Sequence, residues 1–238
     1  MNAIGLSLWM WLLIACGRSS STPPPTPAKP QLLPWVEQLT ANANKDATLP
    51  LVVTMHGRGS DPERFQKFFA DLDVPMRIAH LEAPVLEHDG RAWFTFRGRT
   101  RQDLRNEVDR LADLAVKTTE RIEQTRPTEG KPILVGFSQG AMVVYACVLR
   151  HPGVYRKALP VSGVLFTEPP TDHNAGDMPP VVAMHGERDP VIGPAASVDA
   201  VRALQQLGTQ AELRLFPDAV HWIDGELQKA LFEELKMR

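Results

Sequence analysis

A serine, an aspartate and a histidine follow three different predicted strands in this chain of 238 residues. Ser138 stands in Gly136-Phe137-Ser138-Gln139-Gly140, Asp189 follows His185-Gly186, and His221 comes shortly after the last predicted strand. A serine hydroxyl is a poor nucleophile until a neighbouring base takes its proton, and that base must itself be oriented. We therefore interpret Ser138 as a nucleophile, His221 as its general base and Asp189 as the orienting acid.

Two glycines flank the serine at a spacing of two residues on either side. A nucleophilic serine of this kind stands in a strained conformation on a tight turn between a strand and a helix. A side chain at Gly136 or Gly140 would then meet neighbouring backbone. The pentapeptide predicts such a turn; a glycine-rich turn with a serine that only faces solvent is the alternative.

The same reaction needs donors for the oxyanion of a tetrahedral intermediate, and backbone N–H groups supply them in many hydrolases. Gln139 directly follows the serine, and Arg58 lies in the loop His56-Gly57-Arg58-Gly59 after the first predicted strand. We predict that the N–H groups of Arg58 and Gln139 are the two donors. His56 and Gly57 are interpreted as shaping that loop, with a second catalytic base as the alternative for His56.

Other residues compete for two of these roles. His221 could be a packed histidine beside Trp222 rather than a base. Asp218 and Asp199 are rival acids, but Asp199 should fall within a helix. Asp218 lies so close to His221 in sequence that it could serve only as a turn residue. We therefore favour Asp189.

Apolar strands alternate with amphipathic segments and place these residues. Strands are expected at 51–55, 76–81, 133–135, 158–161, 181–184 and 213–216. Helices are expected at 60–72, where Ser60-Asp61-Pro62-Glu63 predicts a capping box, and at 102–125, 140–149, 195–207 and 223–236. This alternation predicts an α/β fold with a mainly parallel sheet covered on both faces. Ligands bind beyond the carboxyl ends of such strands, where the three residues fall.

From about residue 51 the chain resembles the phospholipase/carboxylesterase family of α/β-hydrolases, which includes acyl-protein thioesterases and small bacterial carboxylesterases. The matching motifs are His56-Gly57-Arg58-Gly59, Ala92-Trp93-Phe94, Gly136 to Ala141, His185-Gly186-x-x-Asp189-Pro190-Val191 and His221. The resemblance implies an α/β-hydrolase fold, a Ser138–Asp189–His221 triad, oxyanion donors at Arg58 and Gln139, no metal and no cofactor. Thr95 replaces an acidic residue usual in the family, and Ser60-Asp61 follows the first loop; both differences bear on substrate preference.

The expected activity is that of a serine carboxylesterase that hydrolyses small or lipid-like carboxylic esters through an acyl-enzyme. An acyl thioesterase or a lysophospholipase could use the same triad, and a serine peptidase usually adds a second domain. A non-catalytic, lipid-anchored binding protein is the alternative of another class. Acyl-chain length, leaving group and oligomeric state are left open.

Composition excludes several other classes. The chain is 43% hydrophobic and 23% charged, as expected for a folded domain. A net charge of −2 argues against a nucleic-acid partner. Two cysteines are too few for a disulfide scaffold or a cysteine zinc cluster, and Cys147 is expected to be a buried apolar residue. His80, Glu82, Glu87 and His88 lack the spacing of a metal site.

The first residues predict export and anchoring. Residues 4–15 form an apolar run that is too short to span a bilayer and is typical of a signal peptide. Leu13-Ile14-Ala15-Cys16 resembles the lipobox of bacterial lipoproteins. We expect residues 1–15 to be the signal peptide, Cys16 to be lipidated, 16–33 to be a Pro/Ser/Thr-rich linker and 34–238 to be the hydrolase domain. The protein would lie in the bacterial cell envelope, at the outer membrane or periplasm of a host with two membranes; secretion is the alternative.

Two further features of the sequence each allow two interpretations. Arg97, Arg99, Arg101 and Arg105 form either a solvated face or an attraction for an anionic substrate. Residues 164–180, rich in proline and without periodicity, either line the site or join two strands.

Overall fold

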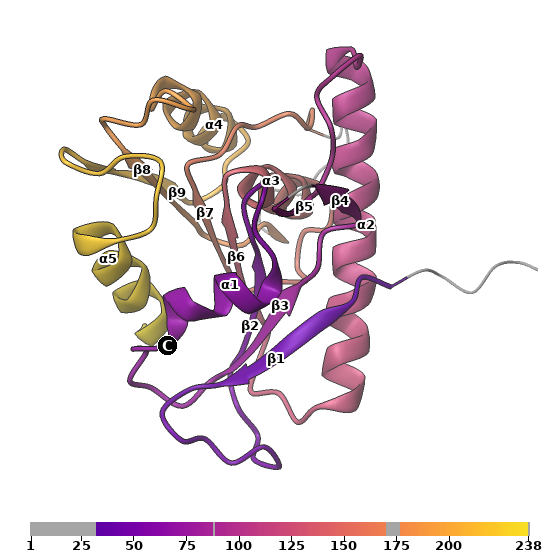
Figure 1. The fold of residues 1–238 in the computed structure, drawn as a ribbon, viewed down its shortest axis with the longest axis vertical. Helices are drawn as coiled ribbons and strands as arrows, with labels where there is room; N and C mark the ends of the chain where they lie inside the picture. The colour runs from indigo at the N-terminus through magenta and orange to yellow at the C-terminus, as the bar shows by residue number, and fades with distance from the viewer. Residues whose placement is uncertain (1–31, 88, 170–176, 238) are drawn as a thin grey trace, which may run out of the picture. The chain divides into compact units, whose positions relative to one another are not determined.

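Short apolar segments form a seven-stranded sheet in the order β1-β3-β2-β6-β7-β8-β9 (Figure 1). The computed structural model describes residues 32–87, 89–169 and 177–237. The strands are β1 (Trp35–Leu39), β2 (Leu51–Met55), β3 (Arg77–Leu81), β6 (Ile133–Phe137), β7 (Lys157–Val161), β8 (Val181–Gly186) and β9 (Ala211–Phe216). Only the pairing of β1 with β3 is antiparallel; the other pairs in this sheet are parallel.

Helices cover both faces of the sheet because alternate strand residues point to opposite sides. The helices are α1 (Pro62–Phe65), the 3₁₀ helix η1 (Gln66–Phe69), α2 (Arg101–Thr125), α3 (Gln139–Arg150), α4 (Ala195–Gln206) and α5 (Gly225–Lys236). Along β2, Leu51, Val53 and Met55 belong to the core that α2, α3 and α4 cover. Val52 belongs to the other core, under α1, η1 and α5.

The predicted α/β class is therefore confirmed. The six expected strands are β2, β3 and β6 to β9, and four of the five expected helices begin and end within two residues of α2, α3, α4 and α5. The strands β1, β4 (Val85–Glu87) and β5 (Gly90–Ala92) were not predicted. The last two form a separate antiparallel pair whose three-residue strands are too short to show periodicity.

The helix expected at 60–72 is wrong in length and in its cap. Four residues of α-helix are followed by four of 3₁₀ helix. Asp61, not Ser60, is the N-cap, because its Oδ1 accepts from the backbone N–H of Arg64 at 2.8 Å and Pro62 then takes the first helical position. Proline is favoured there because its missing N–H would have no helical partner.

The predicted signal peptide, Cys16 and the linker up to residue 31 lie outside the described residues. Among the helices that are described, none combines the length and the apolar character needed to cross a membrane.

Candidate active site

Ser138 stands on the turn between β6 and α3 with φ +53° and ψ −116°. Residues other than glycine rarely adopt such a conformation, so the predicted strain is present. A Cβ on Gly140 would lie 2.1 Å from the carbonyl oxygen of Met55, and one on Gly136 would lie 2.6 Å from the Gly140 backbone. The two glycines thus let the turn pack against β2, which leaves the serine at the carboxyl edge of the sheet.

Loops from β6, β8 and β9 bring the three predicted residues together. The imidazole Nε2 of His221 lies 2.9 Å from Ser138 Oγ, and its Nδ1 lies 2.6 Å from Asp189 Oδ2. A carboxylate can only accept, so Nδ1–H donates to it and Nε2 is left to accept from the serine hydroxyl. This geometry is what proton transfer from the serine requires.

The Asp189 carboxylate is held by two further contacts within its own loop. Its Oδ1 accepts from the backbone N–H groups of Val191, at 2.8 Å, and Ile192, at 2.9 Å. Burial by itself would raise the pKa of Asp189, but these N–H groups and His221 outweigh it and hold the pKa below its ordinary value. The side chain is therefore ionised at neutral pH.

A second histidine, which sequence reasoning did not assign, contacts the same carboxylate. His185 is fully buried on β8, and its Nε2 lies 3.2 Å from Asp189 Oδ2 and 2.8 Å from the carbonyl oxygen of Ile192. Both are acceptors, so Nε2 carries the proton; Nδ1 then accepts from Ser197 Oγ at 2.6 Å. His185 belongs to the motif that ends at Asp189, which is the signal that could have identified it.

The structure separates the rival acids from the site. Asp218 forms an ion pair with Arg188 at 3.0 Å, and its side chain is 86% exposed. Asp199 lies on α4, as expected, and forms an ion pair with Arg202. Neither is near enough to orient His221 by a hydrogen bond.

The loop after β2 lies against Ser138. Arg58, Gln139 and Ser138 line one pocket together. Within the described part of the chain, the backbone N–H groups of Arg58 and Gln139 donate to no backbone acceptor. Both N–H groups are thus free to donate to a substrate oxygen, which agrees with their predicted role.

The side chain of Gln139 has a task that the sequence did not indicate. Its Oε1 accepts from the backbone N–H of Trp93 at 3.0 Å, and its Nε2 donates to the carbonyl oxygen of Phe94 at 2.9 Å. The indole N–H of Trp93 in turn donates to the carbonyl oxygen of His56 at 2.7 Å. The Trp93-Phe94 segment therefore ties the residue after the serine to the loop that carries Arg58.

His56 is enclosed in that loop. The side chain is buried, its Nδ1 donates to the carbonyl oxygen of Gly57 at 2.7 Å, and its Nε2 accepts from the N–H of Ala83 at 3.4 Å. Burial lowers the pKa of His56, which favours the neutral ring. Both ring nitrogens are occupied, as expected of a residue that shapes the loop.

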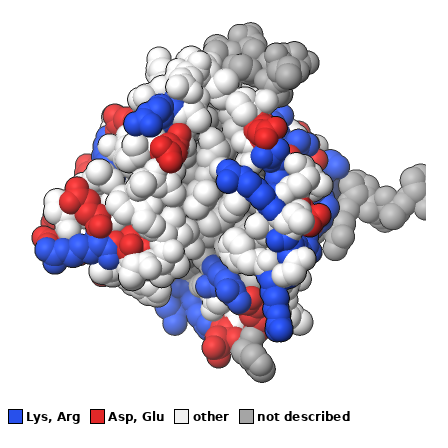
Figure 2. Space-filling view, turned by 90° about the horizontal axis from the view of Figure 1, so that it is seen from above, with Lys and Arg blue, Asp and Glu red and all other residues white. Residues whose placement is uncertain are grey.

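The pocket at Ser138, here called the serine pocket, has a volume of about 590 Å³. Its walls include Met142 of α3, Phe96, and Val164, Phe166 and Val191 from the loops beside it. Seen from the carboxyl edge of the strands, the middle of the molecular surface is uncharged and hollowed, with Lys and Arg side chains gathered along one side (Figure 2). The start of the 164–180 segment thus lines the site; residues 170–176 are outside the described part.

The four arginines between Arg97 and Arg105 make different contacts. Arg105 donates to the carbonyl oxygen of Phe166 at 3.1 Å and forms an ion pair with Glu168. Arg101 lies over the Phe166 ring, 6.0 Å from its centre. These two side chains hold a wall of the serine pocket, whereas Arg97 and Arg99 are exposed.

Other titratable residues take structural positions. Burial raises the pKa of the Cys147 thiol, which confirms a buried apolar role. His80 lies between Thr54 and Gln38, and burial lowers its pKa to about 3. Among the residues that the structure describes, no group of three or more His, Cys, Asp or Glu side chains could hold a metal ion.

A mainly parallel sheet with helices on both faces and a serine on a strained strand-to-helix turn define an α/β-hydrolase fold. The chain belongs to the phospholipase/carboxylesterase family, whose sequence profile matches residues 37–237. It is 27% identical over 192 residues to esterase YpfH of Escherichia coli K12, covering 78% of this chain and 82% of that one.

Solved structures share the fold. The crystal structure of esterase PE8 superposes with a TM-score of 0.70 at 22% identity, over 87% of this chain and 99% of that chain. A carboxylesterase from Mesorhizobium loti superposes with a TM-score of 0.68 at 19% identity, over 81% and 91%. The resemblance to the family that the motifs indicated is confirmed.

Proposed function

We propose that this protein is a serine carboxylesterase that hydrolyses carboxylic esters through an acyl-enzyme, with Ser138, His221 and Asp189 as its catalytic residues. The observation that carries the proposal is the continuous line of contacts from Ser138 Oγ to His221 and on to Asp189, at 2.9 and 2.6 Å. The similarity to proteins named esterases supports the same class of reaction.

In the first half of the proposed reaction, Ser138 Oγ attacks the ester carbonyl carbon while His221 Nε2 takes the hydroxyl proton. The N–H groups of Arg58 and Gln139 donate to the oxyanion that forms. The tetrahedral intermediate then collapses, the bond to the alcohol oxygen breaks, and His221 gives its proton to that oxygen. The alcohol leaves and the acyl group stays on Ser138.

In the second half, water attacks the acyl-enzyme and His221 takes a proton from it. Collapse of this intermediate breaks the bond to Ser138, which recovers a proton from His221, and the carboxylic acid leaves. Asp189 remains ionised throughout and stabilises the imidazolium, which its lowered pKa favours.

The test combines covalent labelling with kinetics. A fluorophosphonate probe should label the wild type on Ser138, and p-nitrophenyl butyrate should be hydrolysed. Ser138→Ala should abolish labelling and reduce kcat by roughly 10⁴-fold or more, because the three residues act as one unit. Labelling that survives this substitution would refute the mechanism.

A thioesterase or lysophospholipase activity is the second candidate, because leaving-group identity places little demand on this machinery. The apolar walls of the serine pocket favour an acyl chain. A panel of p-nitrophenyl esters of rising chain length, beside an acyl thioester and a lysophospholipid, separates the candidates by kcat/KM. A chain that binds these compounds without turning any over would instead support the non-catalytic alternative.

We also propose that the protein is a lipoprotein of the bacterial cell envelope, with Cys16 as its lipidated residue. The support is the sequence alone: an apolar run over 4–15, the Leu13-Ile14-Ala15-Cys16 motif and the Pro/Ser/Thr-rich stretch after it.

A further inference from the structure

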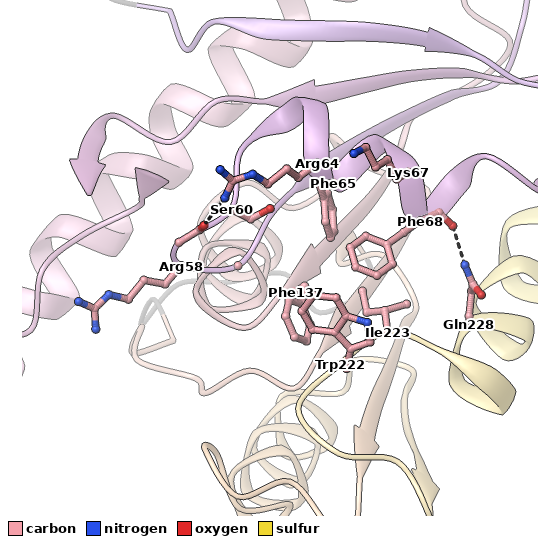
Figure 3. Close-up of a pocket in the computed structure, with 12 residues that line it drawn as sticks. Arg58, Ser60, Arg64, Phe65, Lys67, Phe68, Phe137, Trp222, Ile223 and Gln228 are labelled. Carbon is pink, nitrogen blue, oxygen red and sulfur yellow. Dashed lines mark hydrogen bonds between the residues drawn. The ribbon is translucent and has the colours of Figure 1, made fainter. Parts of the chain in front are cut away.

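A second pocket of about 580 Å³ lies next to the serine pocket, on the side of α1, η1 and α5. We call it the aromatic pocket, since its walls are Phe65, Phe68, Phe137, Trp222 and Ile223 (Figure 3). These side chains come from three segments far apart in sequence. The catalytic residues proposed above do not line it, and so far it has no role.

The aromatic pocket has a buried floor and exposed walls. Phe65, Phe137 and Ile223 are almost fully buried, whereas Trp222 is 52% exposed. The Trp222 ring packs edge-on against Phe68, with ring centres 5.3 Å apart. Open aromatic surface of this kind is unfavourable in water and is typical of ligand sites.

The pocket joins the reaction centre through chain neighbours of the catalytic residues. Phe137 precedes Ser138, Trp222 follows His221, and the Phe137 ring lies 4.9 Å from the His221 ring, centre to centre. Arg58 and Gly59 line both pockets. The two pockets therefore meet at the loop that carries the proposed oxyanion donor.

An ester has two halves that diverge from its carbonyl carbon, and two adjoining pockets can take one each. The serine pocket is lined by Ser138, Gln139 and Met142, the side to which the acyl group stays bound. The alcohol oxygen must remain within reach of His221, which lines the serine pocket and whose ring packs on Phe137 at the border with the aromatic pocket. This assigns the alcohol half to the aromatic pocket.

The charged residues around the aromatic pocket restrict the chemistry of the preferred alcohol further. Arg58, Arg64 and Lys67 line the aromatic pocket, and no carboxylate among the described residues does. The guanidinium groups of Arg58 and Arg64 pair with Glu87 and Asp61, but Lys67 forms no ion pair with a described residue. Figure 3 shows Lys67 and Arg64 on the side of the pocket opposite Trp222. A negative group on the ligand would meet these cations.

We propose that the aromatic pocket binds the alcohol half of the ester, and that the preferred alcohol is aromatic and carries an anionic group. This inference rests on the proposed esterase activity, because only a cleaved ester has an alcohol half. The fit is that of an aryl ring packed against the exposed surface of Phe68 and Trp222, which contact each other, with a carboxylate directed to Lys67.

A matched pair of esters tests the charge. The esters are 4-carboxyphenyl butyrate and 4-carbamoylphenyl butyrate, which differ in charge but hardly in shape. We expect the wild type to prefer the carboxylate in kcat/KM, and Lys67→Gln to reduce that preference roughly fivefold, as for a charge pair at a water-exposed site. Lys117→Gln, an exposed lysine on α2, is the control and should leave the ratio unchanged. Equal ratios in wild type and Lys67→Gln would overturn the proposal.

A second variant tests which half of the ester the pocket holds. Phe68→Ala should lower kcat/KM for phenyl butyrate roughly tenfold relative to ethyl butyrate, by loss of one wall of the pocket. The hydrolysis rate of the butyryl-enzyme, measured after acylation in a single turnover, should not change, since the alcohol has already left. A change in that rate, or an effect that follows acyl-chain length, would place the acyl half there and refute the assignment.

Binding separates this inference from the proposed activity. Ser138→Ala protein should bind 4-hydroxybenzoate in calorimetry, bind 4-hydroxybenzamide less tightly, and lose the difference when Lys67→Gln is added. If no ester is hydrolysed but this pattern holds, the esterase proposal fails and the anion-binding aromatic pocket stands. If esters are hydrolysed and neither compound binds, the pocket assignment fails alone.

Discussion

The proposed reaction centre, formed by Ser138, Asp189 and His221, and the two pockets beside it are built in opposite ways. Ser138 and Asp189 are 8% and 7% exposed, and the polar atoms of Asp189 and His221 have partners within 3.2 Å. Pocket walls such as Trp222 and Val191 are 52% and 67% exposed. The centre is thus complete without substrate, whereas the pockets present apolar surface that a ligand would cover.

This difference in exposure indicates which kinetic parameters should change when residues of the centre or of the pockets are substituted. A preorganised centre stabilises charge in the transition state because its groups need not move during the reaction. Its substitutions should therefore reduce kcat for every substrate. Pocket walls contribute binding that depends on what the substrate presents, so their substitutions should alter ratios between substrates.

The largest expected effect concerns the orienting acid. Asp189→Asn should reduce kcat by about 10⁴-fold, because an amide in place of the carboxylate favours the wrong His221 tautomer. The matched control is Asp218→Asn, which changes an exposed carboxylate and should retain wild-type kinetics. If Asp218→Asn abolishes activity and Asp189→Asn keeps it, the acid has been misassigned.

The second prediction concerns the turn that holds the serine. Gly140→Ala would place a methyl group 2.1 Å from the Met55 carbonyl oxygen, so α3 and β2 would have to separate. We expect a loss of about 1–3 kcal/mol in the free energy of unfolding by urea, as for other overpacked sites, with a much lower kcat. Gly193→Ala is the control, because a Cβ there meets no atom within 4 Å. Equal stability of the two variants would show that the turn tolerates the methyl group.

The third prediction is that substitution of His185 shifts the pH dependence of kcat. His185→Phe removes the Nε2–H group that donates to the carbonyl oxygen of Ile192 and lies 3.2 Å from Asp189 Oδ2, and we expect kcat to fall about 10-fold. Without this polar group 3.2 Å away, Asp189 should stabilise the His221 imidazolium more strongly, so the acidic limb of the kcat profile should move to higher pH. His185→Gln, which can restore an N–H donor, should recover part of both effects. A uniform loss of activity with an unmoved profile would leave His185 only a packing role.

The fourth prediction follows from the lowered pKa of Asp189. A carboxyl group whose pKa falls on folding stabilises the native state above its ordinary value of 3.8, and that contribution is lost as pH falls through the folded value. The free-energy difference of unfolding between wild type and Asp189→Asn should therefore be constant near neutral pH and shrink below about pH 4. A difference that grows on acidification would contradict the sign of this pKa shift.

The same division explains what the sequence could predict. Ser138, Gly136 and Gly140 form a local pattern because one turn imposes all three residue types. The aromatic pocket has no such pattern, since Phe68 and Trp222 meet only after β2 and β9 take their places in the sheet. Its walls look like ordinary core residues in the sequence.

Short elements, and elements that mix apolar and polar residues, also could not be predicted from the sequence. The residues of β1, Trp35–Leu39, mix apolar and polar types because they form an edge strand that is buried only in part. At η1, the capping box predicted an α-helix that continues to Leu72, but the helix tightens to 3₁₀ geometry at Gln66 and ends at Phe69. There the packing of Phe65 and Phe69 under α5 outweighs local propensity.

The smallest expected effect on catalysis belongs to the N-terminal residues. If Cys16 carries lipid, its acyl chains supply about 0.8 kcal/mol per buried CH₂, and several chains together hold a protein on a membrane. The 14 residues from Gly17 to Pro30 would reach at most about 43 Å as extended polyproline II. Both the centre and the pockets are built from later residues, so a chain beginning at Gln31 should keep the full kcat/KM for p-nitrophenyl butyrate.

Fractionation of the producing cells completes this last test. Full-length protein should sediment with membranes and yield a mature chain that begins at Cys16, whereas Cys16→Ser should be released or remain unprocessed. Because the proposed linker would separate the hydrolase domain from the membrane, neither form should differ in activity on a small ester. Wild type found in the supernatant with residues 1–15 still attached would refute the lipoprotein proposal. The hydrolase proposal would be unaffected by that result, since none of its catalytic residues or oxyanion donors precedes Arg58.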